Sequence, residues 1–185
     1  AFYLLSLILF LMTVERGTFF LVLSLSSFAA GFFCKETAVT LPVVILAVDY
    51  LFLSGRKLEE VLKRKHVHLA YWAVLAAVLI FRRYALGELA DTGKHAGQYW
   101  TTASYLAVQP SVILKYLKLM LVPVGQTIDH QILPPGRIFE PRLILSWIGL
   151  LCVPLAGWRV CKKWPQLSAQ VIFGLVWMAI TLAPT

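Results

Sequence analysis

Charged side chains that interrupt otherwise apolar segments are the residues of this sequence best suited to chemistry. Lys35 and Glu36 stand between two apolar segments, and Arg82 and Arg83 follow another one. A guanidinium group grips phosphate oxygens through two parallel hydrogen bonds, so the two arginines predict a phosphate-binding site. Lipid headgroups would satisfy the arginines equally well, and Lys35 with Glu36 is also typical of an interfacial ion pair that neutralises itself. Both interpretations stay open for these four residues.

Two more pairs are candidate binding residues. Lys115 and Lys118 are three residues apart, so on a helix they share a face that suits a phosphate or an ordinary lipid headgroup. Asp129 and His130 have the side chains of an acid–base or hydrogen-bonded pair. Adjacent side chains do not normally face each other, so this spacing alone does not predict a catalytic dyad.

No metal site is predicted, and none of the short catalytic motifs is present. His66 and His68 flank a single valine and have no third ligand nearby in the sequence. The three cysteines show no C-x-x-C spacing, so they predict neither a zinc site nor a disulfide framework. Glycine-rich phosphate loops, G-x-S-x-G and H-E-x-x-H are all missing.

The composition indicates which solvent surrounds these residues. The chain has 185 residues, of which 59% are hydrophobic, and its mean hydropathy is +0.77. A soluble domain of this size cannot keep its surface wet with so few polar residues, so lipid must be the solvent. The net charge of +8 comes partly from short basic clusters between apolar blocks, where cations face anionic headgroups rather than nucleic acid.

Six apolar blocks predict the helices that position the candidate residues. We expect an all-α membrane protein with about six transmembrane helices, arranged as a single transmembrane domain over residues 1–185. Several blocks are shorter than the roughly 20 residues that a bilayer needs, so flanking residues must extend them. The predicted helices are 1–14, 18–33, 37–53, 69–81, 143–158 and 168–183.

The basic links predict the orientation. Residues 54–65 carry five Lys or Arg, place Leu58, Val61 and Leu62 on one helical face, and offer a Glu59–Lys63 pair, so we expect a cytoplasmic interfacial helix. Asp49 precedes this link and is expected to pair with nearby cations or helix ends. The basic residues 159–163 fall on the same side if residues 82–142 form an extracytoplasmic loop.

Within the loop, residues 105–124 form an apolar run bracketed by Pro110 and Pro123. About a dozen unbroken residues would measure about 18 Å, which is too short to cross the membrane. We therefore expect an interfacial amphipathic helix with Pro110 in its first turn.

Three segments of the sequence resemble one known family. Residues 34–52 contain C-K-E-T-A-V-T-L-P and then D-Y-L-F, residues 115–123 read K-Y-L-K-L-M-L-V-P ahead of Asp129 and His130, and residues 174–185 run from G-L-V-W to A-P-T. In order and spacing they are similar to motifs of the transmembrane and tetratricopeptide-repeat-containing O-mannosyltransferase-like proteins. Cys34 and Val48 depart from the family pattern, which often has serine and an aromatic residue there.

The resemblance implies a membrane glycosyltransferase of the GT-C type. It would transfer a sugar from a polyprenyl-phosphate donor to an acceptor, expected to be a protein, on the outer or lumenal face, without a cofactor or metal. Its membrane would be the bacterial inner membrane or the endoplasmic reticulum. The outer-face cations would hold the donor phosphate, and Tyr99, Trp100 and Tyr105 would stack on the sugar.

The resemblance also implies missing parts. The chain has no initiator methionine and starts inside an apolar run, so we expect a fragment. The family's acidic catalytic residue would then lie upstream of Ala1, and its tetratricopeptide repeats beyond Thr185. Two other functions remain open: a transporter or flippase for a lipid-linked or anionic substrate, and a non-catalytic membrane anchor for a repeat scaffold.

Overall fold

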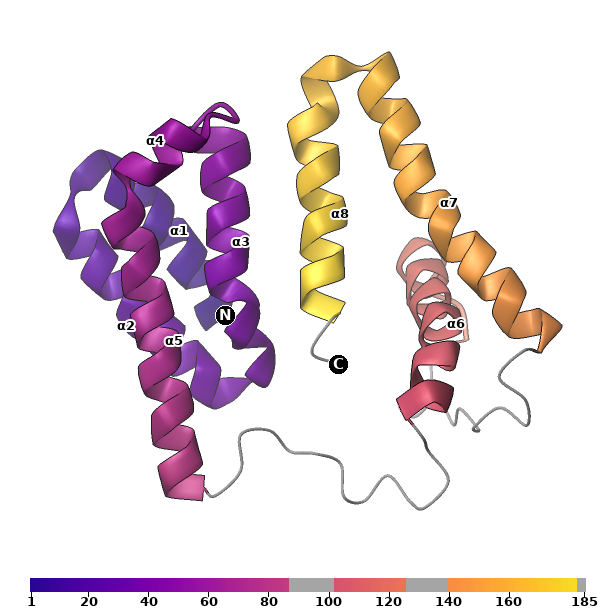
Figure 1. Ribbon diagram of the computed structural model, residues 1–185, viewed down its shortest axis with the longest axis horizontal. Coiled ribbons are helices and arrows are strands. Elements are labelled where there is room, and N and C mark those ends of the chain that lie inside the picture. The colour runs from indigo at the N-terminus through magenta and orange to yellow at the C-terminus, as the bar shows by residue number, and fades with distance from the viewer. Residues whose placement is uncertain (87–101, 126–139, 183–185) are drawn as a thin grey trace. The chain divides into compact units, whose positions relative to one another are not determined.

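A computed structural model describes residues 1–86, 102–125 and 140–182, and all regular structure in these ranges is helical (Figure 1). The chain divides into two compact units, Ala1–Asp91 with Gln166–Thr185 and Thr92–Pro165. The all-α prediction is confirmed for the described ranges.

The first unit contains five of the six predicted apolar helices and the interfacial link. The predicted helices are found with shifted ends, and the fourth starts earlier and ends later than the sequence predicts. The elements are α1 (Phe2–Arg16), α2 (Thr18–Cys34), η1 (Glu36–Thr40), α3 (Leu41–Val48), η2 (Asp49–Leu53), α4 (Leu58–Lys63), α5 (Lys65–Leu86) and α8 (Ser168–Leu182). With α8, all five predicted helices of this unit are present.

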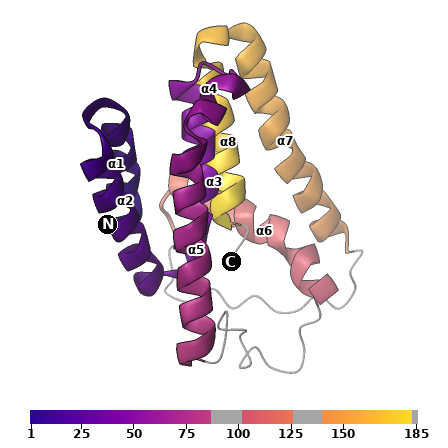
Figure 2. The same ribbon diagram turned by 60° about the vertical axis from the view of Figure 1, so that its left-hand side comes forward.

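The turn between α1 and α2 depends on one glycine. Gly17 has φ 94° and ψ −169°, a backbone region that is open essentially only to glycine. A single residue therefore reverses the chain, and α1 packs antiparallel to α2 as a hairpin (Figure 2). Ser27 Oγ donates to the Phe2 carbonyl at 3.1 Å, and a Cβ added at Gly31 would lie only 3.3 Å from the Phe2 Cβ, so the two helices approach closely here.

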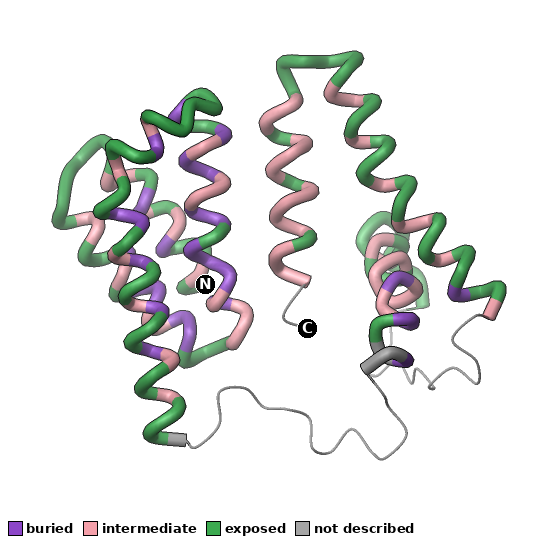
Figure 3. The backbone as a smooth tube through the Cα atoms, in the orientation of Figure 1, coloured by how far each residue is buried: buried purple, intermediate pink, exposed green. Residues whose placement is uncertain are grey.

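The core of the first unit lies where α1, α2, α3 and α5 meet (Figure 3). Its largest fully buried side chain is Tyr71 of α5, which stacks edge-on against Phe10 of α1 with ring centroids 6.2 Å apart. The Tyr71 hydroxyl lies 2.5 Å from Ser24 Oγ, and Ser24 in turn contacts Ser6. These hydroxyls form hydrogen bonds with one another inside an apolar interface, so burying them costs little free energy.

The link between α3 and α5 confirms one expectation and corrects another. A short helix, α4, forms within the basic link as predicted, and its Val61 is buried. Lys63 pairs with Glu60 at 2.6 Å, so the predicted Glu59–Lys63 pair is wrong. Both spacings, i,i+3 and i,i+4, bring side chains together on a helix, and α4 is too short for the sequence to fix which of them forms.

The second unit contains α6 (Thr102–Leu121) and α7 (Pro141–Lys163), followed by a short turn, η3 (Pro165–Leu167). The prediction that Pro110 lies in the first turn of its helix is wrong, because Pro110 is buried inside α6. Ala107 and Val108, before the proline, and Val112, after it, pack in one cluster with Leu143 of α7. Pro110 has no N–H to donate to the carbonyl of Leu106, four residues earlier. Ser111 Oγ makes a separate local hydrogen bond to the Val108 carbonyl at 2.7 Å.

Four helical stretches of the described chain are long and apolar enough to cross a membrane: Glu36–Leu53, Lys65–Ala85, Pro141–Lys163 and Pro165–Leu182. The apolar helix α2 has 17 residues and α1 has 15, so both are shorter. Helix α6 is not among the four, although its 20 residues exceed the dozen predicted from the sequence. Lysines near the end of α7 lie over tryptophan rings, Lys162 over Trp158 and Lys163 over Trp164, as is typical of a membrane interface.

Candidate functional site

The candidate site lies in the short segment between the end of α2 and the start of α3. Lys35 has an extended backbone (φ −157°, ψ 131°) that ends α2 and starts the 3₁₀ turn η1. Thr40 Oγ1 donates to the Thr37 carbonyl at 2.7 Å and contacts the Tyr3 hydroxyl at 3.0 Å, which fixes this turn to α1. The Lys35–Glu36 segment is therefore positioned by α2, which precedes it, and by the η1 turn, which is bonded to α1.

An ion pair crosses from this turn to the end of α5. Arg82 Nη2 donates to Glu36 Oε1, although the two residues are 46 positions apart in the sequence. The Arg82 side chain is only 16% exposed, whereas that of Glu36 is 46% exposed. Lys35 is exposed and forms no ion pair with the described residues. Glu36 is thus neutralised by Arg82 rather than by its neighbour in the sequence.

One hydrogen-bond donor of Arg82 is not used by the ion pair with Glu36. Its Nε–H is buried and has no hydrogen-bond partner among the described residues. A buried donor without an acceptor costs about 1–3 kcal/mol, so such a group needs an explanation in a native structure. An acceptor from a ligand would remove this cost.

A pocket of about 280 Å³ opens at the same place. Its walls come from the end of α2, the η1 turn and the end of α5, and it is lined by Phe32, Phe33, Cys34, Lys35, Glu36 and Arg82. Binding pockets for whole small molecules usually measure roughly 300–1,000 Å³. The pocket is therefore of a size for a charged headgroup rather than for a complete lipid-linked ligand.

Among the predicted site residues that the structure describes in the first unit, Lys35, Glu36 and Arg82 lie together at the pocket. Arg83 is exposed at the end of α5 and does not line the pocket. Lys115 and Lys118 are exposed on α6, which belongs to the second unit.

The remaining predicted residues are not described. Asp129, His130, Tyr99 and Trp100 lie outside the described residues, as does the side chain of Tyr105. Their predicted roles stay predictions.

The sequence was compared with known proteins in three ways. No protein-family model, no curated protein and no solved structure matches it. The family resemblance of the three segments stays a prediction.

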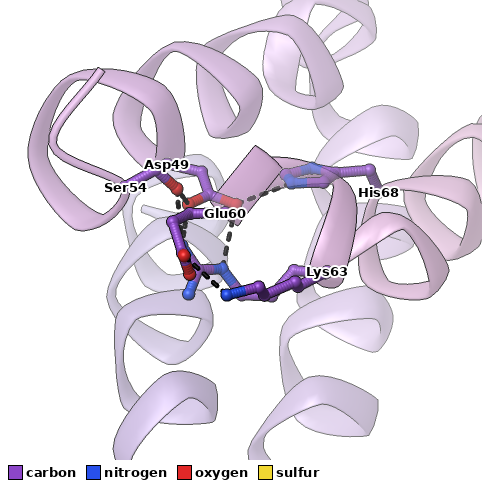
Figure 4. A network of polar contacts seen from close by, with 6 residues as sticks. Asp49, Ser54, Glu60, Lys63 and His68 are labelled. Atoms are coloured by element: carbon purple, nitrogen blue, oxygen red, sulfur yellow. Dashed lines mark hydrogen bonds and ion pairs between the residues drawn. The ribbon is translucent and has the colours of Figure 1, made fainter. Parts of the chain in front are cut away.

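A second polar cluster lies at the opposite end of α3, and sequence analysis found only one of its members. The Asp49 carboxylate is fully buried and accepts bonds from Arg64 Nη2 at 2.5 Å, Arg64 Nε at 3.1 Å and Ser54 Oγ at 2.8 Å. His68 Nε2 lies 2.7 Å from the other carboxylate oxygen, so this nitrogen carries the proton that it donates (Figure 4). We refer to Asp49, Ser54, Arg64 and His68 as the Asp49 cluster.

The local backbone explains why Ser54 belongs to this cluster. Asp49 begins a π-helical turn in which the Ser54 amide donates to the Asp49 carbonyl at 2.7 Å. This turn places residues five apart on the same face, whereas an α-helix brings together residues three or four apart. The expectation that Asp49 pairs with nearby cations is confirmed, but its partner is Arg64, fifteen residues along the chain.

The Asp49 cluster fastens the basic link to the membrane helices. Hydrogen bonds to Asp49 raise the pKa of the Arg64 guanidinium above its already high ordinary value, so Arg64 is always charged. Every oxygen of the carboxylate is occupied by donors from this chain. The cluster is therefore a structural joint between η2, α4 and α5, because it leaves the carboxylate no room for a substrate.

Proposed function

We propose that this chain is part of a membrane glycosyltransferase that uses a polyprenyl-phosphate sugar donor, with Arg82 and Lys35 holding the donor phosphate. The observation that carries the proposal is the nearly buried Arg82, whose Nε–H lacks a partner among the described residues and which lines a pocket with a second cation, Lys35. A phosphate would accept hydrogen bonds from both side chains. Glu36 neutralises Arg82 until the phosphate replaces it.

The apolar walls favour a phosphate attached to a lipid tail. Phe33 lines the pocket and packs edge-on against Phe81 of α5, with ring centroids 5.9 Å apart. Both rings are exposed, at 62% and 57%. In a membrane they would face lipid, and an isoprenoid chain would lie against them while its phosphate enters the pocket.

The proposed reaction is an inverting sugar transfer. The acceptor hydroxyl attacks the anomeric carbon, a new C–O bond forms, the bond between that carbon and the phosphate oxygen breaks, and the hydroxyl proton passes to a base. Polyprenyl phosphate leaves with the extra negative charge, which Arg82 and Lys35 would stabilise. In this proposal another residue acts as the base, and Arg82 and Lys35 bind and orient the leaving group.

The proposal includes a GT-C architecture with six spans. Helices α1, α2, α7, α8, α5 and the continuous stretch from η1 to η2 would be the spans, with α1 and α2 extended or locally thinning the bilayer. The protein would then be multi-pass, in the bacterial inner membrane or the endoplasmic reticulum. The basic link at α4 would be cytoplasmic, and the pocket at Arg82 would open on the other face.

Cys34 makes the phosphate proposal testable, because this residue lines the pocket and is exposed. In a chain with Cys152→Ser and Cys161→Ser, Cys34 is the only cysteine, and its rate of reaction with a maleimide reports pocket occupancy. We expect polyprenyl phosphate to slow this reaction, and the uncharged polyprenol to leave it unchanged. Equal protection by both lipids would show that only the tail binds.

Three substitutions sharpen the test. Arg82→Gln should raise the polyprenyl phosphate concentration needed for half-protection roughly tenfold to a hundredfold, because a hydrogen bond to a charged group is lost. Arg83→Gln is the matched control, since Arg83 is the next residue and does not line the pocket, and it should have little effect. Glu36→Gln should strengthen binding, because it removes the carboxylate that competes with the phosphate. Unchanged protection in Arg82→Gln would refute the assignment.

Catalysis needs a separate experiment. The full-length protein, supplied with a polyprenyl-phosphate sugar and a peptide acceptor, should release polyprenyl phosphate, and Arg82→Gln should slow that release. Binding without sugar transfer, but with movement of the donor across a vesicle membrane, would favour a flippase. Binding with neither activity would favour a membrane anchor.

A further inference from the structure

A second pocket lies beside the turn between α1 and α2, at the opposite end of the first unit from Arg82. Its volume is about 300 Å³. One wall comes from the α1–α2 hairpin and includes Phe10, Val14 and Leu21. The other includes Arg64, which lies between α4 and α5, and His66 at the start of α5. Nothing in the proposed sugar transfer uses this pocket.

The polarity of the pocket changes with depth. Phe10 precedes the end of α1 by about two turns and Leu21 follows the start of α2 by about one turn, so both lie some 5–9 Å inside the hairpin. Arg64 and His66 lie at the charged end of the pocket, where the basic link joins α5. An amphiphile has the same gradient, with an apolar chain below a charged headgroup. A small water-soluble anion would leave the apolar walls of the pocket without a ligand contact.

Arg64 is oriented before any ligand arrives. Its Nε and Nη2 donate to Asp49, and Nη2 also contacts Ser54 Oγ at 2.7 Å. The hydrogen bonds of Arg64 with the described residues use Nε and Nη2 and not Nη1, and the side chain is 24% exposed. A guanidinium held in this way loses little rotamer freedom when it binds an anion.

The charge around the pocket favours an anion. The pocket lining contains no carboxylate. The link before it, residues 54–65, carries five Lys or Arg against two Glu. Each cation near a membrane surface attracts an anionic lipid by about 1 kcal/mol.

We infer that this pocket binds the phosphate headgroup of an anionic phospholipid from the membrane leaflet next to the α1–α2 turn. Arg64 and His66 donate to the phosphate, and the first carbons of an acyl chain lie against Val14, Leu21 and Phe10. The bound lipid fills the space between the hairpin and α5. This inference is independent of the proposed sugar transfer, because the two pockets lie at opposite ends of the helices.

The test compares two spin-labelled lipids bound to the purified protein in phosphatidylcholine nanodiscs. The motionally restricted fraction of phosphatidylglycerol should exceed that of phosphatidylcholine by an affinity ratio on the order of fivefold. Val14→Trp fills the pocket from its exposed rim, and His66→Ala removes one donor, so each should abolish most of the preference. Lys63→Ala is the control, because Lys63 belongs to the same link, is 69% exposed and does not line the pocket.

The remaining outcomes overturn the inference. An equal loss of preference in Lys63→Ala would mean that diffuse surface charge attracts the lipid. Displacement of the labelled lipid by millimolar inorganic phosphate would mean a site for a free anion. Full preference in Val14→Trp, with helix content unchanged by circular dichroism, would place the lipid elsewhere. Protection of Cys34 by polyprenyl phosphate should be unaffected in all three variants, which separates this test from that of the donor site.

Discussion

Removal of Asp49 is the sharpest test of what fastens the basic link to the membrane helices. The Asp49 side chain is fully buried and accepts hydrogen bonds from Arg64, Ser54 and His68. Asp49→Ala leaves the four donor groups of these three residues without this acceptor and leaves a partly buried positive charge unpaired. Breaking a buried ion pair from one side costs about 3–5 kcal/mol of unfolding free energy.

The contacts themselves support a value in this range. Each buried donor left without an acceptor costs about 1–3 kcal/mol, so the four donor groups set an upper bound of about 12 kcal/mol. Arg64 is 24% exposed, so water can reach part of its guanidinium and the cost falls below that bound. Ser54 and His68 are 4% and 7% exposed and have less access to water.

A double-mutant cycle separates the ion pair from its surroundings. We expect Asp49→Ala with Arg64→Ala to cost less than the sum of the two single changes, by about 1–3 kcal/mol, because the double variant buries no unpaired charge. The measurement is unfolding in mixed micelles of dodecyl maltoside and dodecyl sulfate, followed by far-ultraviolet circular dichroism. Lys63→Ala is the control, because it breaks the exposed pair with Glu60 on the same link.

Two results would refute the reasoning. Strict additivity would mean that Asp49 and Arg64 stabilise the protein independently of each other. A loss in Asp49→Ala no larger than the loss in Lys63→Ala would mean that burial does not strengthen this ion pair. Either result would also weaken the lipid site, since Asp49 is what orients Arg64 there.

Three further predictions concern the turn, the link and the topology. Gly17→Ala should destabilise the protein by about 1–3 kcal/mol in the same unfolding assay, because φ 94° strains a side chain, whereas Gly174→Ala, inside α8 with open space around it, should be neutral or stabilising. Lys63 lowers the pKa of Glu60, so the stabilisation by this pair is complete above the ordinary glutamate pKa of about 4.3 and is lost as the pH falls through the lowered value. Melting curves of the native chain and of Glu60→Gln should therefore converge only in acid. A difference that persists in acid would contradict the assignment. A membrane-impermeant maleimide added to the extracytoplasmic side should label Cys34 but not Cys161, and the reverse pattern would invert the proposed orientation.

The helices themselves could be predicted from the sequence, because the requirement behind them is local. Every backbone N–H and C=O in lipid must be bonded within its own segment, so a long apolar run has few alternatives to a helix. The ends were less certain, as α5 shows by starting at Lys65. Pro110 was misplaced because a proline in isolation favours a helix start, and only the packing of α6 on α7 shows that the helix continues through it.

The sequence predicts which residues form the candidate site but not that they lie together. Residue type marked Lys35, Glu36 and Arg82 as charges that a membrane segment does not carry without a reason. Their grouping depends on which faces of α2 and α5 meet, and that rotation is set by the core around Tyr71 and Phe10 rather than by any local pattern. The sequence by itself therefore determined the apolar helices and the charges at their ends, because solvent and backbone hydrogen bonding act residue by residue. Only the tertiary structure decided that Glu36 pairs with Arg82 and Asp49 with Arg64, because those pairs join segments that side-chain packing brings together.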